Sequence, residues 1–359
     1  MDRLKVAILG CGDVAQRDYL PEMHRLAGRV EVVAVCGRRE ARVREVAGQY
    51  GIPAIFTDYR RMLAEMTADA IVNLTPIQLH AETTLACLTA GKHVYSEKPA
   101  AASVEEATRL RDEAARRGLI LVCAPSVLLY PQMRLARELL DQDAIGPVHS
   151  ARGHGHGGVP PWQGYPSDPS PFFAAGGGPA VDMGVYPLHA LTGLLGPARR
   201  VSAMTAQAQP SFVVADGPFA GKTVRIEVAD TWHTVLDLGG ARLASIEANN
   251  VVQGTRSPQL ELFGLRGTIA LNLLDVAAPV EVLRPSGEWE QISVPHDRAG
   301  GPDHVLGVEH LVDCVRTGKP PVLSVDHAIH VLEIVESAER SAAIGRALEL
   351  NTTFERVAG

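Results

Sequence analysis

Cysteine pairs are absent from this sequence, and their absence narrows the class of protein. The five cysteines lie far apart, with no C-x-x-C pair: Cys11, Cys36, Cys87, Cys123 and Cys314. An odd, scattered set argues against a disulfide framework or a structural zinc site and favours buried thiols in a reducing compartment. The start of the sequence has no signal-peptide layout, so we expect a cytoplasmic protein.

Long apolar runs and long runs of like charge are also absent. No apolar stretch is long enough to cross a bilayer, so we expect no membrane association. The formal net charge is −7 without a basic cluster, which gives no support to binding of nucleic acid. Hydrophobic residues make up 46% of the 359 residues and charged residues 21%, which is typical of a globular chain long enough for two domains.

What the sequence does contain is a regular alternation of apolar strands and helices over its first third. The strands are expected at residues 4–9, 30–36, near 55, 70–74, 93–95 and 119–123, and this pattern is typical of a doubly wound parallel sheet. From residue 200 onward, alternating strands with Gly or Pro turns dominate before two closing helices. We therefore predict an α/β protein with a Rossmann domain at residues 1–125. A second α/β domain at residues 126–359 would carry a mostly antiparallel sheet.

The first strand is followed by the clearest motif. Gly10, Gly12 and Ala15 form the G-x-G-x-x-A pattern in the strand–turn–helix setting of dinucleotide-binding proteins. Gly10 permits a tight turn, Gly12 lets a pyrophosphate approach the backbone, and Ala15 allows close packing of the helix. The loop residues Asp13 and Val14 precede a helix whose free N–H groups suit phosphates. We predict that these five residues bind NAD or NADP.

The end of the second strand bears on which of the two cofactors is used. NAD-binding chains usually have an acidic residue there, whereas a nearby arginine accommodates the 2′-phosphate of NADP. This sequence has Gly37, Arg38 and Arg39 at that position, and guanidiniums suit a phosphate in charge and geometry. NADP is therefore favoured over NAD, although the two arginines could simply be solvated.

Two further strands end in polar residues at the same edge of the predicted sheet. Thr75 and Pro76 break the strand at residues 70–74, and His80 begins the next helix. Glu97 and Lys98 follow the strand at residues 93–95, before Pro99. Ligands of open α/β sheets bind at the carboxyl ends of the strands. We assign Thr75, Pro76, His80, Glu97 and Lys98 to the cofactor site. We also expect Lys98 to take part in the reaction.

Three proton-carrying side chains follow a Gly-rich stretch in the second domain. Asp182, Tyr186 and His189 have the spacing i, i+4 and i+7, which places them on one face of an otherwise apolar helix. We predict a catalytic group facing the nucleotide. The alternative is that Asp182 caps the helix while Tyr186 and His189 are buried and hydrogen-bonded.

These motifs together resemble a known family. The fingerprint, Thr75-Pro76 with His80, Glu97-Lys98-Pro99, and Asp182-x-Gly184-x-Tyr186 occur in the order seen in the glucose–fructose oxidoreductase, inositol dehydrogenase and rhizopine-catabolism (Gfo/Idh/MocA) family. The resemblance covers essentially the whole chain. Many members have His at the position of Tyr186, and the Tyr form resembles the glucose–fructose oxidoreductase and dihydrodiol dehydrogenase branches.

The resemblance implies a fold, a reaction and an assembly. It implies a Rossmann domain followed by an α/β domain with a large open sheet, through which homodimers or homotetramers form. It implies NAD(P)-dependent oxidation or reduction of a secondary alcohol or carbonyl on a sugar, cyclitol or similar polyol. It also often implies a cis peptide bond between Lys98 and Pro99.

The chemistry of hydride transfer suggests roles for the candidate residues. A proton must leave or join the substrate oxygen, and a free tyrosine with a pKa of about 10 is a poor base near neutrality. A nearby ammonium favours phenolate, so we assign the acid/base to Tyr186 and its tuning to Lys98, with Asp182 as an orienting group. His189 is the alternative base. The alternative function is an NAD(P)-binding sensor or scaffold that no longer turns over.

Two further features precede this helix. His154 and His156 would point to one face of a strand, where they could line the substrate site or join Asp182 or His189 around a metal; we predict no metal. Trp162 and Tyr165 could stack on a sugar face or merely fix a long loop.

Overall fold

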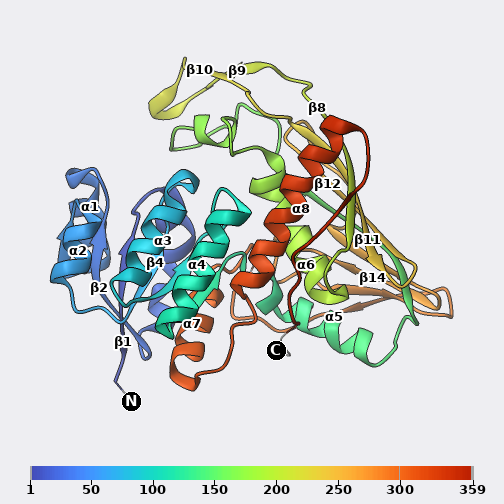
Figure 1. Cartoon of the computed structure of the whole chain (residues 1–359), viewed down its shortest axis with the longest axis horizontal. Coiled ribbons are helices and arrows are strands. Elements are labelled where there is room, and N and C mark those ends of the chain that lie inside the picture. Colours follow the sequence, from blue (N-terminus) through green and yellow to red (C-terminus); the bar gives the residue numbers. More distant parts are fainter. Residues whose placement is uncertain (1, 299, 357–359) are drawn as a thin grey trace. The chain divides into compact units, whose positions relative to one another are not determined.

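The structure is a computed structural model that describes residues 2–298 and 300–356. The chain divides into two compact units (Figure 1). The first contains the chain up to Ser126 and His304–Ile329, and the second contains Val127–Asp303 and the chain from His330 onward. The sequence-based division, with residues 126–359 in one domain, differs from this grouping at residues 304–329.

The first unit is built on a six-stranded parallel sheet, as predicted. The strand order is β3-β2-β1-β4-β5-β6, so the chain moves outward from β1 in both directions. A sheet that reverses direction in this way opens a ligand-binding crevice at the carboxyl ends of β1 and β4. The strands are β1 (Leu4–Leu9), β2 (Val30–Cys36), β3 (Ala54–Phe56), β4 (Ala70–Asn73), β5 (His93–Ser96) and β6 (Leu121–Cys123).

Helices cover both faces of this sheet. Helix α7 contacts β5 and β6, so residues from late in the sequence complete the first unit (Figure 1). Ser103 caps α4 by accepting a hydrogen bond from the Glu106 amide, and the Glu106 carboxylate accepts one from the Ala102 amide. The helices are α1 (Glu40–Tyr50), α2 (Tyr59–Glu65), η3 (Ile77–Leu79), α3 (His80–Thr89), α4 (Val104–Arg117) and α7 (Val305–Thr317).

The segment after the fingerprint is helical but not a regular α-helix. A π-helical turn, η1 (Ala15–Tyr19), is followed by a 3₁₀ segment, η2 (Leu20–Leu26). Pro21 lies in the first turn of η2 and has no N–H to donate to a preceding turn. The proline accounts for the break in the α-helical pattern, and Tyr19 becomes the last residue of the wide turn.

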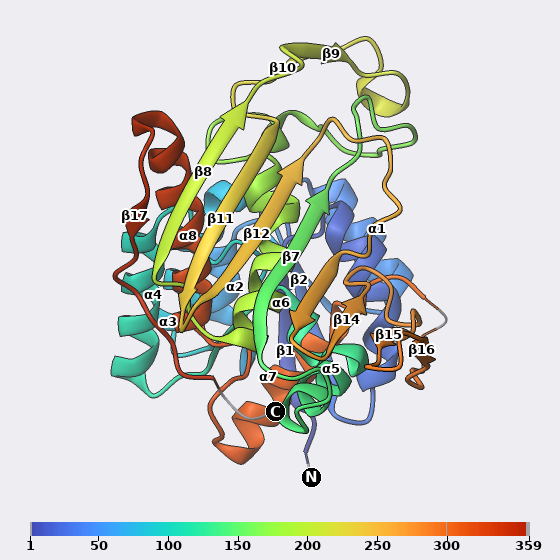
Figure 2. The ribbon, with the colours of Figure 1, turned by 90° about the vertical axis from the view of Figure 1, so that its right-hand side faces the viewer.

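The second unit is organised around a nine-stranded sheet. Its order is β16-β15-β14-β13-β7-β12-β11-β8-β17, and only β7 and β12 pair in parallel among its described strands. Figure 2 looks onto this sheet with α6 and α8 behind it. The strands are β7 (Val148–His156), β8 (Arg200–Ala206), β11 (Thr231–Gly239), β12 (Arg242–Asn249), β13 (Leu260–Gly264), β14 (Gly267–Leu271), β15 (Val280–Leu283), β16 (Trp289–Ile292) and β17 (Leu348–Glu349).

Helices pack on one face of this sheet and leave the other open. Buried residues alternate along β11 and β12 with exposed ones such as Val235 and Leu243. This alternation is typical of a sheet with one buried face, and the mostly antiparallel pairing of its strands confirms the prediction. The helices of the unit are α5 (Pro131–Asp141), η6 (Ala180–Gly184) and α6 (Val185–Leu195), and α8 (Val325–Ile344) begins in the first unit and continues into the second.

A small lobe with its own apolar cluster projects from this unit. Strands β9 (Ser211–Val213) and β10 (Thr223–Arg225) form a separate two-stranded sheet. Phe173 and Phe212 lie at the centre of the cluster, with ring centroids 5.0 Å apart. Both strands therefore lie outside the main sheet.

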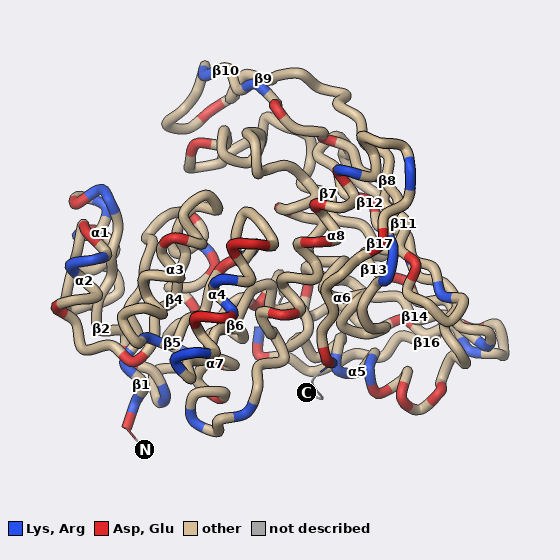
Figure 3. The backbone as a smooth tube through the Cα atoms, in the orientation of Figure 1, with Lys and Arg blue, Asp and Glu red and all other residues tan. Residues whose placement is uncertain are grey.

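Charge is distributed evenly over the described residues. Lys and Arg are interleaved with Asp and Glu along both units (Figure 3). No helix of the described residues is both long and apolar enough to cross a membrane.

Candidate active site

The fingerprint loop requires glycine at one position for reasons internal to the fold. Gly10 has a φ of +101°, and a Cβ there would lie 2.4 Å from the Leu74 carbonyl oxygen. A Cβ on Gly12 would meet nothing within 4 Å, so no neighbouring atom of the described chain explains that glycine. Open space beside Gly12 fits the approach of a cofactor phosphate to the backbone.

Gln16 stabilises this loop and was not identified from the sequence. Its side-chain amide donates to the carbonyl oxygens of Cys11 and Gly12, at 2.9 and 3.0 Å. Both hydrogen bonds use carbonyl oxygens of the loop, so the N–H groups of the loop remain available to other partners. The signal was available, since a polar residue directly after G-x-G-x-x-A can reach back to the loop.

Arginines gather where β2 ends. The side chains of Arg38 and Arg39 are exposed and make no hydrogen bond or ion pair with other described residues. A Cβ on Gly37 would lie 2.5 Å from the Cys11 sulfur, so the fingerprint loop packs directly against this strand end. Burial raises the pKa of the Cys11 thiol, while the charges of Arg42 and Arg39 oppose the rise. At least two guanidiniums therefore lie near the fingerprint.

The end of β4 is fixed by an asparagine. The Asn73 amide donates to the hydroxyls of Thr83 and Thr84, both at 2.9 Å, and its oxygen accepts from the Thr75 hydroxyl at 2.8 Å. Asn73 is fully buried. These bonds tie the Thr75-Pro76 turn to helix α3, so the turn is held rigidly at the ligand edge.

His80 lies beneath this edge rather than on it. Its Nδ1 is 2.7 Å from the Pro99 carbonyl oxygen and its Nε2 is 2.7 Å from the Thr75 carbonyl oxygen. A neutral imidazole carries one ring N–H, so both contacts are hydrogen bonds only in the protonated form. Burial lowers the pKa of His80, and the Pro99 carbonyl and the Glu97 charge oppose that shift. His80 thus connects the turn at Thr75 with the segment at Pro99.

The Glu97-Lys98-Pro99 segment follows β5 as predicted. The Glu97 amide donates to the Asn73 carbonyl at 3.0 Å, and the Glu97 carboxylate accepts from the Lys98 amide at 2.9 Å. The Lys98–Pro99 peptide bond is cis, as the family resemblance implied. Lys98 is therefore placed by the backbone at the carboxyl end of a central strand.

The second unit carries the other candidate residues. Asp182 lies in the π turn η6, and Tyr186 and His189 lie in the α-helix that follows. The sequence predicts regular α-helical spacing for all three residues. Because the π turn η6 extends to Gly184, this spacing holds only between Tyr186 and His189. Tyr186 is 8% exposed and His189 is 5% exposed.

His189 is a poor match to the role of a base near neutrality. Burial, with a smaller contribution from the charge of His330, lowers the pKa of His189 to about 3. It therefore remains neutral throughout the physiological range. This burial fits the alternative interpretation, in which His189 is a core histidine.

His154 and His156 lie on the opposite face of the sheet from Asp182. A Cβ on Gly155, between them, would lie 2.2 Å from the Met183 carbonyl oxygen, so Gly155 faces the π turn and its neighbours face away. The two histidine rings stack with centroids 4.4 Å apart, and His156 Nε2 is 3.4 Å from a Glu247 oxygen. A metal site that combines them with Asp182 or His189 is not formed.

Trp162 and Tyr165 belong to the apolar cluster of the small lobe. The Trp162 ring lies 5.1 Å from Phe173 and 5.6 Å from Phe172 and Tyr165, and its N–H donates to the Gly158 carbonyl. These contacts match the interpretation in which the aromatics fix a long loop. Among the described residues, no cluster of three His, Cys, Asp or Glu side chains could hold a metal ion.

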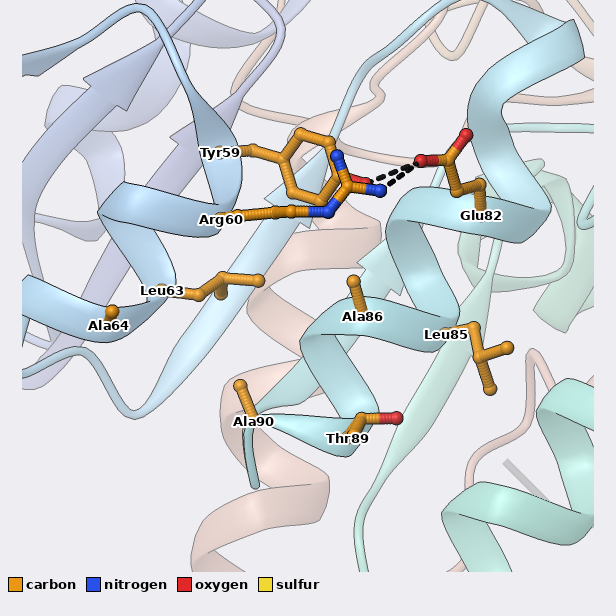
Figure 4. Close-up of a pocket in the computed structure, with 9 residues that line it drawn as sticks. All are labelled: Tyr59, Arg60, Leu63, Ala64, Glu82, Leu85, Ala86, Thr89 and Ala90. Carbon is orange, nitrogen blue, oxygen red and sulfur yellow. Dashed lines mark hydrogen bonds and ion pairs between the residues drawn. The ribbon is translucent and has the colours of Figure 1, made fainter.

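A groove between α2 and α3 holds none of the candidate residues (Figure 4). Its volume is about 490 Å³, and its apolar lining includes Leu63, Ala86 and Ala90. At its rim one oxygen of Glu82 accepts from the Tyr59 hydroxyl at 2.6 Å and from Arg60 at 2.7 Å. The polar groups of the rim therefore satisfy each other.

Comparison with known proteins identifies the family. Residues 4–124 match the oxidoreductase family with an NAD-binding Rossmann fold, and residues 133–270 match the GFO/IDH/MocA C-terminal domain. The chain belongs to the Gfo/Idh/MocA family. The predicted family, fold class and NAD(P)-dependent oxidoreductase activity are thereby confirmed.

Named relatives act on sugars. The chain is 29% identical over 310 residues to dTDP-3,4-didehydro-2,6-dideoxy-alpha-D-glucose 3-reductase of Streptomyces violaceoruber, covering 82% of each chain. It is 31% identical over 195 residues to D-glucoside 3-dehydrogenase of Escherichia coli strain K12, covering 54% of each. Levoglucosan dehydrogenase, solved with NADH and L-sorbose, shares the fold with a TM-score of 0.83 at 20% identity, covering 98% of this chain and 100% of the other.

Proposed function

We propose that this protein is an NADP-preferring oxidoreductase that acts on a secondary alcohol or carbonyl of a sugar, cyclitol or similar polyol. The observation that carries the proposal is the placement of Lys98 at the carboxyl end of β5, in the sheet whose fingerprint loop leaves space beside Gly12. Two relatives are named for position 3 of a glucose ring substituted at carbon 1. We therefore propose carbon 3 of a substituted hexopyranose as the first position to test.

The cofactor preference rests on the end of β2. The guanidinium groups of Arg38 and Arg39 are exposed and unpaired among the described residues, and no acidic residue stands between Cys36 and Glu40. A 2′-phosphate would give these guanidiniums a negatively charged partner, whereas a ribose hydroxyl carries no charge. Gly10, Gly12 and Ala15 would hold the pyrophosphate, and the bound nicotinamide supplies or accepts the hydride.

The chain's own residues manage the proton. In our proposal Lys98 donates a hydrogen bond to the reacting oxygen of the substrate and its charge favours the phenolate of Tyr186. Tyr186 takes the proton during oxidation and returns it during reduction, while Asp182 orients Lys98 or a substrate hydroxyl. The deep burial and low pKa of His189 support Tyr186 as the proton carrier.

Two further proposals concern setting and assembly. The open face of the nine-stranded sheet is proposed as the contact of a homodimer or homotetramer. All five cysteines are unpaired and buried, which supports a reducing cytoplasmic setting.

The proposal is tested first on the unmodified protein. Fluorescence titration should show tighter binding of NADPH than of NADH, and Arg38→Ser should reduce that difference. Turnover is then followed by the absorbance of reduced nicotinamide with glucosides, nucleotide-linked sugars, free aldoses and cyclitols. Tight cofactor binding without turnover of any of them would favour a sensor or scaffold protein instead.

The catalytic roles are tested with Lys98→Met and Tyr186→Phe. Each should lower kcat by about 10²-fold or more, because general acid–base groups contribute on that scale, while NADPH still binds. Lys92→Met, at the opposite end of the same strand, is the matched control and should retain turnover. Near-normal turnover in both test variants would refute the assignment.

A further inference from the structure

Three buried oxygen-bearing side chains meet where β5 ends. Tyr19, the last residue of the π turn after the fingerprint, donates its hydroxyl to Oε1 of Glu97. The hydroxyls of Tyr19 and Tyr95 are 2.9 Å apart. Both tyrosines are fully buried and Glu97 is 7% exposed. A carboxylate buried to this degree depends on such donors to compensate for lost water.

The second oxygen of the same carboxylate reaches the backbone of the proposed catalytic lysine. Glu97 Oε2 accepts from the Lys98 amide at 2.9 Å. One carboxylate therefore joins the hydroxyl of the fingerprint segment to the peptide that carries Lys98. Tyr19 and Glu97 are 78 residues apart in the sequence, whereas Glu97 and Lys98 are adjacent.

The direction of the hydrogen bonds follows from the number of protons. A phenol has one proton, so Tyr19, which donates to Glu97, accepts from Tyr95. Burial and the Glu97 charge raise the pKa of Tyr19 well above its usual value, so it stays protonated as the donor. His304 also lies close to the carboxylate, with Nδ1 3.9 Å from Glu97 Oε1. Tyr19 is thus the buried hydroxyl that bonds the carboxylate directly.

We propose that Tyr19 is a positioning residue for Lys98. Its hydroxyl holds the Glu97 carboxylate in the orientation in which the other oxygen also fixes the Lys98 amide. The segment that follows the phosphate-binding loop thereby sets the place of the lysine. The catalytic meaning of this link rests on the proposed function, whereas the link itself is a property of the first unit.

Two matched variants test the link. Tyr19→Phe and Tyr95→Phe each remove one hydroxyl from a fully buried tyrosine; the Tyr19 hydroxyl donates to Glu97, and the Tyr95 hydroxyl donates to Tyr19. Amide hydrogen exchange of the full chain, resolved at Lys98, reports the bond directly and requires no substrate. Tyr19→Phe should accelerate exchange at Lys98 by about tenfold or more, with the Val94 amide unchanged, whereas Tyr95→Phe should have a much smaller effect at Lys98.

Kinetics provide a second readout once a substrate turns over. Tyr19→Phe should lower kcat by about tenfold and leave the KM for the cofactor within about twofold, since the lysine is displaced while the fingerprint loop is intact. If the two hydroxyls had only a structural role, both variants would be less stable, and neither would combine a lower kcat with an unchanged KM for the cofactor. Equal acceleration at Lys98 in both variants, or none in Tyr19→Phe, would overturn the proposal.

The outcome can be separated from that of the proposed function. If the unmodified protein turns over no sugar, the proposed function fails while hydrogen exchange still decides on Tyr19. If Tyr19→Phe does not fold, Glu97→Gln replaces it, because a neutral amide offers one acceptor oxygen to two donors. That variant should also accelerate exchange at Lys98, and unchanged exchange would contradict the proposed link.

Discussion

Two histidines in the second unit, His189 and His330, affect stability through their burial. Burial lowers the pKa of His189 to about 3 and that of His330 to about 4, although the Glu333 charge opposes the second shift. His330 accepts a hydrogen bond from the Ala198 amide at Nε2 and faces Thr352 with Nδ1, so its neutral form is the one that fits. Burial therefore disfavours the protonated form of both rings in the folded protein.

The sign of the resulting pH dependence is fixed by these shifts. An unfolded histidine titrates at a pKa of about 6.5, so between about pH 6.5 and 4 the unfolded chain binds more protons than the folded chain. We predict that the free energy of unfolding falls as the pH is lowered from about 6.5. Each such histidine contributes a slope approaching about 1.4 kcal/mol per pH unit.

Urea unfolding at several pH values between 7.5 and 5 measures this slope. His189→Asn should reduce it by about the contribution of one histidine, and His24→Asn, at an exposed position of η2, serves as the control. His80, whose pKa is also lowered by burial, adds to the slope of the unmodified protein. A slope unaffected by His189→Asn would show that this ring is not held neutral in the fold.

At the scale of elements, strand β7 supports the π turn through its glycines. A Cβ on Gly153 would lie 2.8 Å from a side-chain carbon of Pro187, and one on Gly155 would lie 2.2 Å from the Met183 carbonyl oxygen. A backbone oxygen cannot move aside as a flexible side chain can. The glycines near His154 and His156 are therefore explained by close packing of strand and turn.

We predict that Gly155→Ala is destabilising and impairs turnover. Overpacking typically costs about 1–3 kcal/mol, and relief of the clash would shift the turn that carries Asp182. Urea unfolding and kcat measure the two effects. Gly48→Ala is the control, since a Cβ there meets nothing within 4 Å. If Gly155→Ala were as stable and active as the unmodified protein, the turn would not be held in this way.

The first unit was predictable from the sequence because local signals agreed. β1 and β2 are largely apolar, and Gly51 and Gly118 end helices in the left-handed conformation that favours glycine. The π turn was not predicted, because its departure from an α-helix depends on Pro21 and on packing. β9 was also missed, since it offers only Phe212 as a buried residue in a strand of three.

The candidate site was only partly predictable for a related reason. Motif positions such as Gly10 and Lys98 follow from strand ends, which sequence patterns locate well. The bond between Tyr19 and Glu97 joins residues 78 positions apart, and no local pattern encodes such a contact. The face of His154 likewise depended on which side of β7 the helices cover.

At the scale of the whole molecule, the open face of the nine-stranded sheet carries exposed apolar side chains. Met204 on β8 is 79% exposed, Val235 on β11 is 48% exposed and Leu243 on β12 is 53% exposed. Exposed apolar residues grouped on neighbouring strands are typical of protein–protein contacts, and a two-fold axis would use the same face twice.

We predict that the protein forms a homodimer or homotetramer through this face. Light scattering coupled to size exclusion should show the oligomer, and Val235→Glu should dissociate it by placing a charge in the contact. Val213→Glu is the matched control, because Val213 is 54% exposed on β9, outside the main sheet. A monomeric unmodified protein, or equal behaviour of both variants, would contradict the prediction.

The return of residues 304–329 to the first unit has a consequence for how the protein is made. Helix α7, which packs on β5 and β6, leaves the ribosome only after residues 127–303 have been synthesised. Until then α7 cannot pack on the apolar surface of β5 and β6, and the nascent first unit is comparable to a partly folded intermediate. The order of synthesis therefore makes the second unit's chain available for folding before the nucleotide-binding unit is complete.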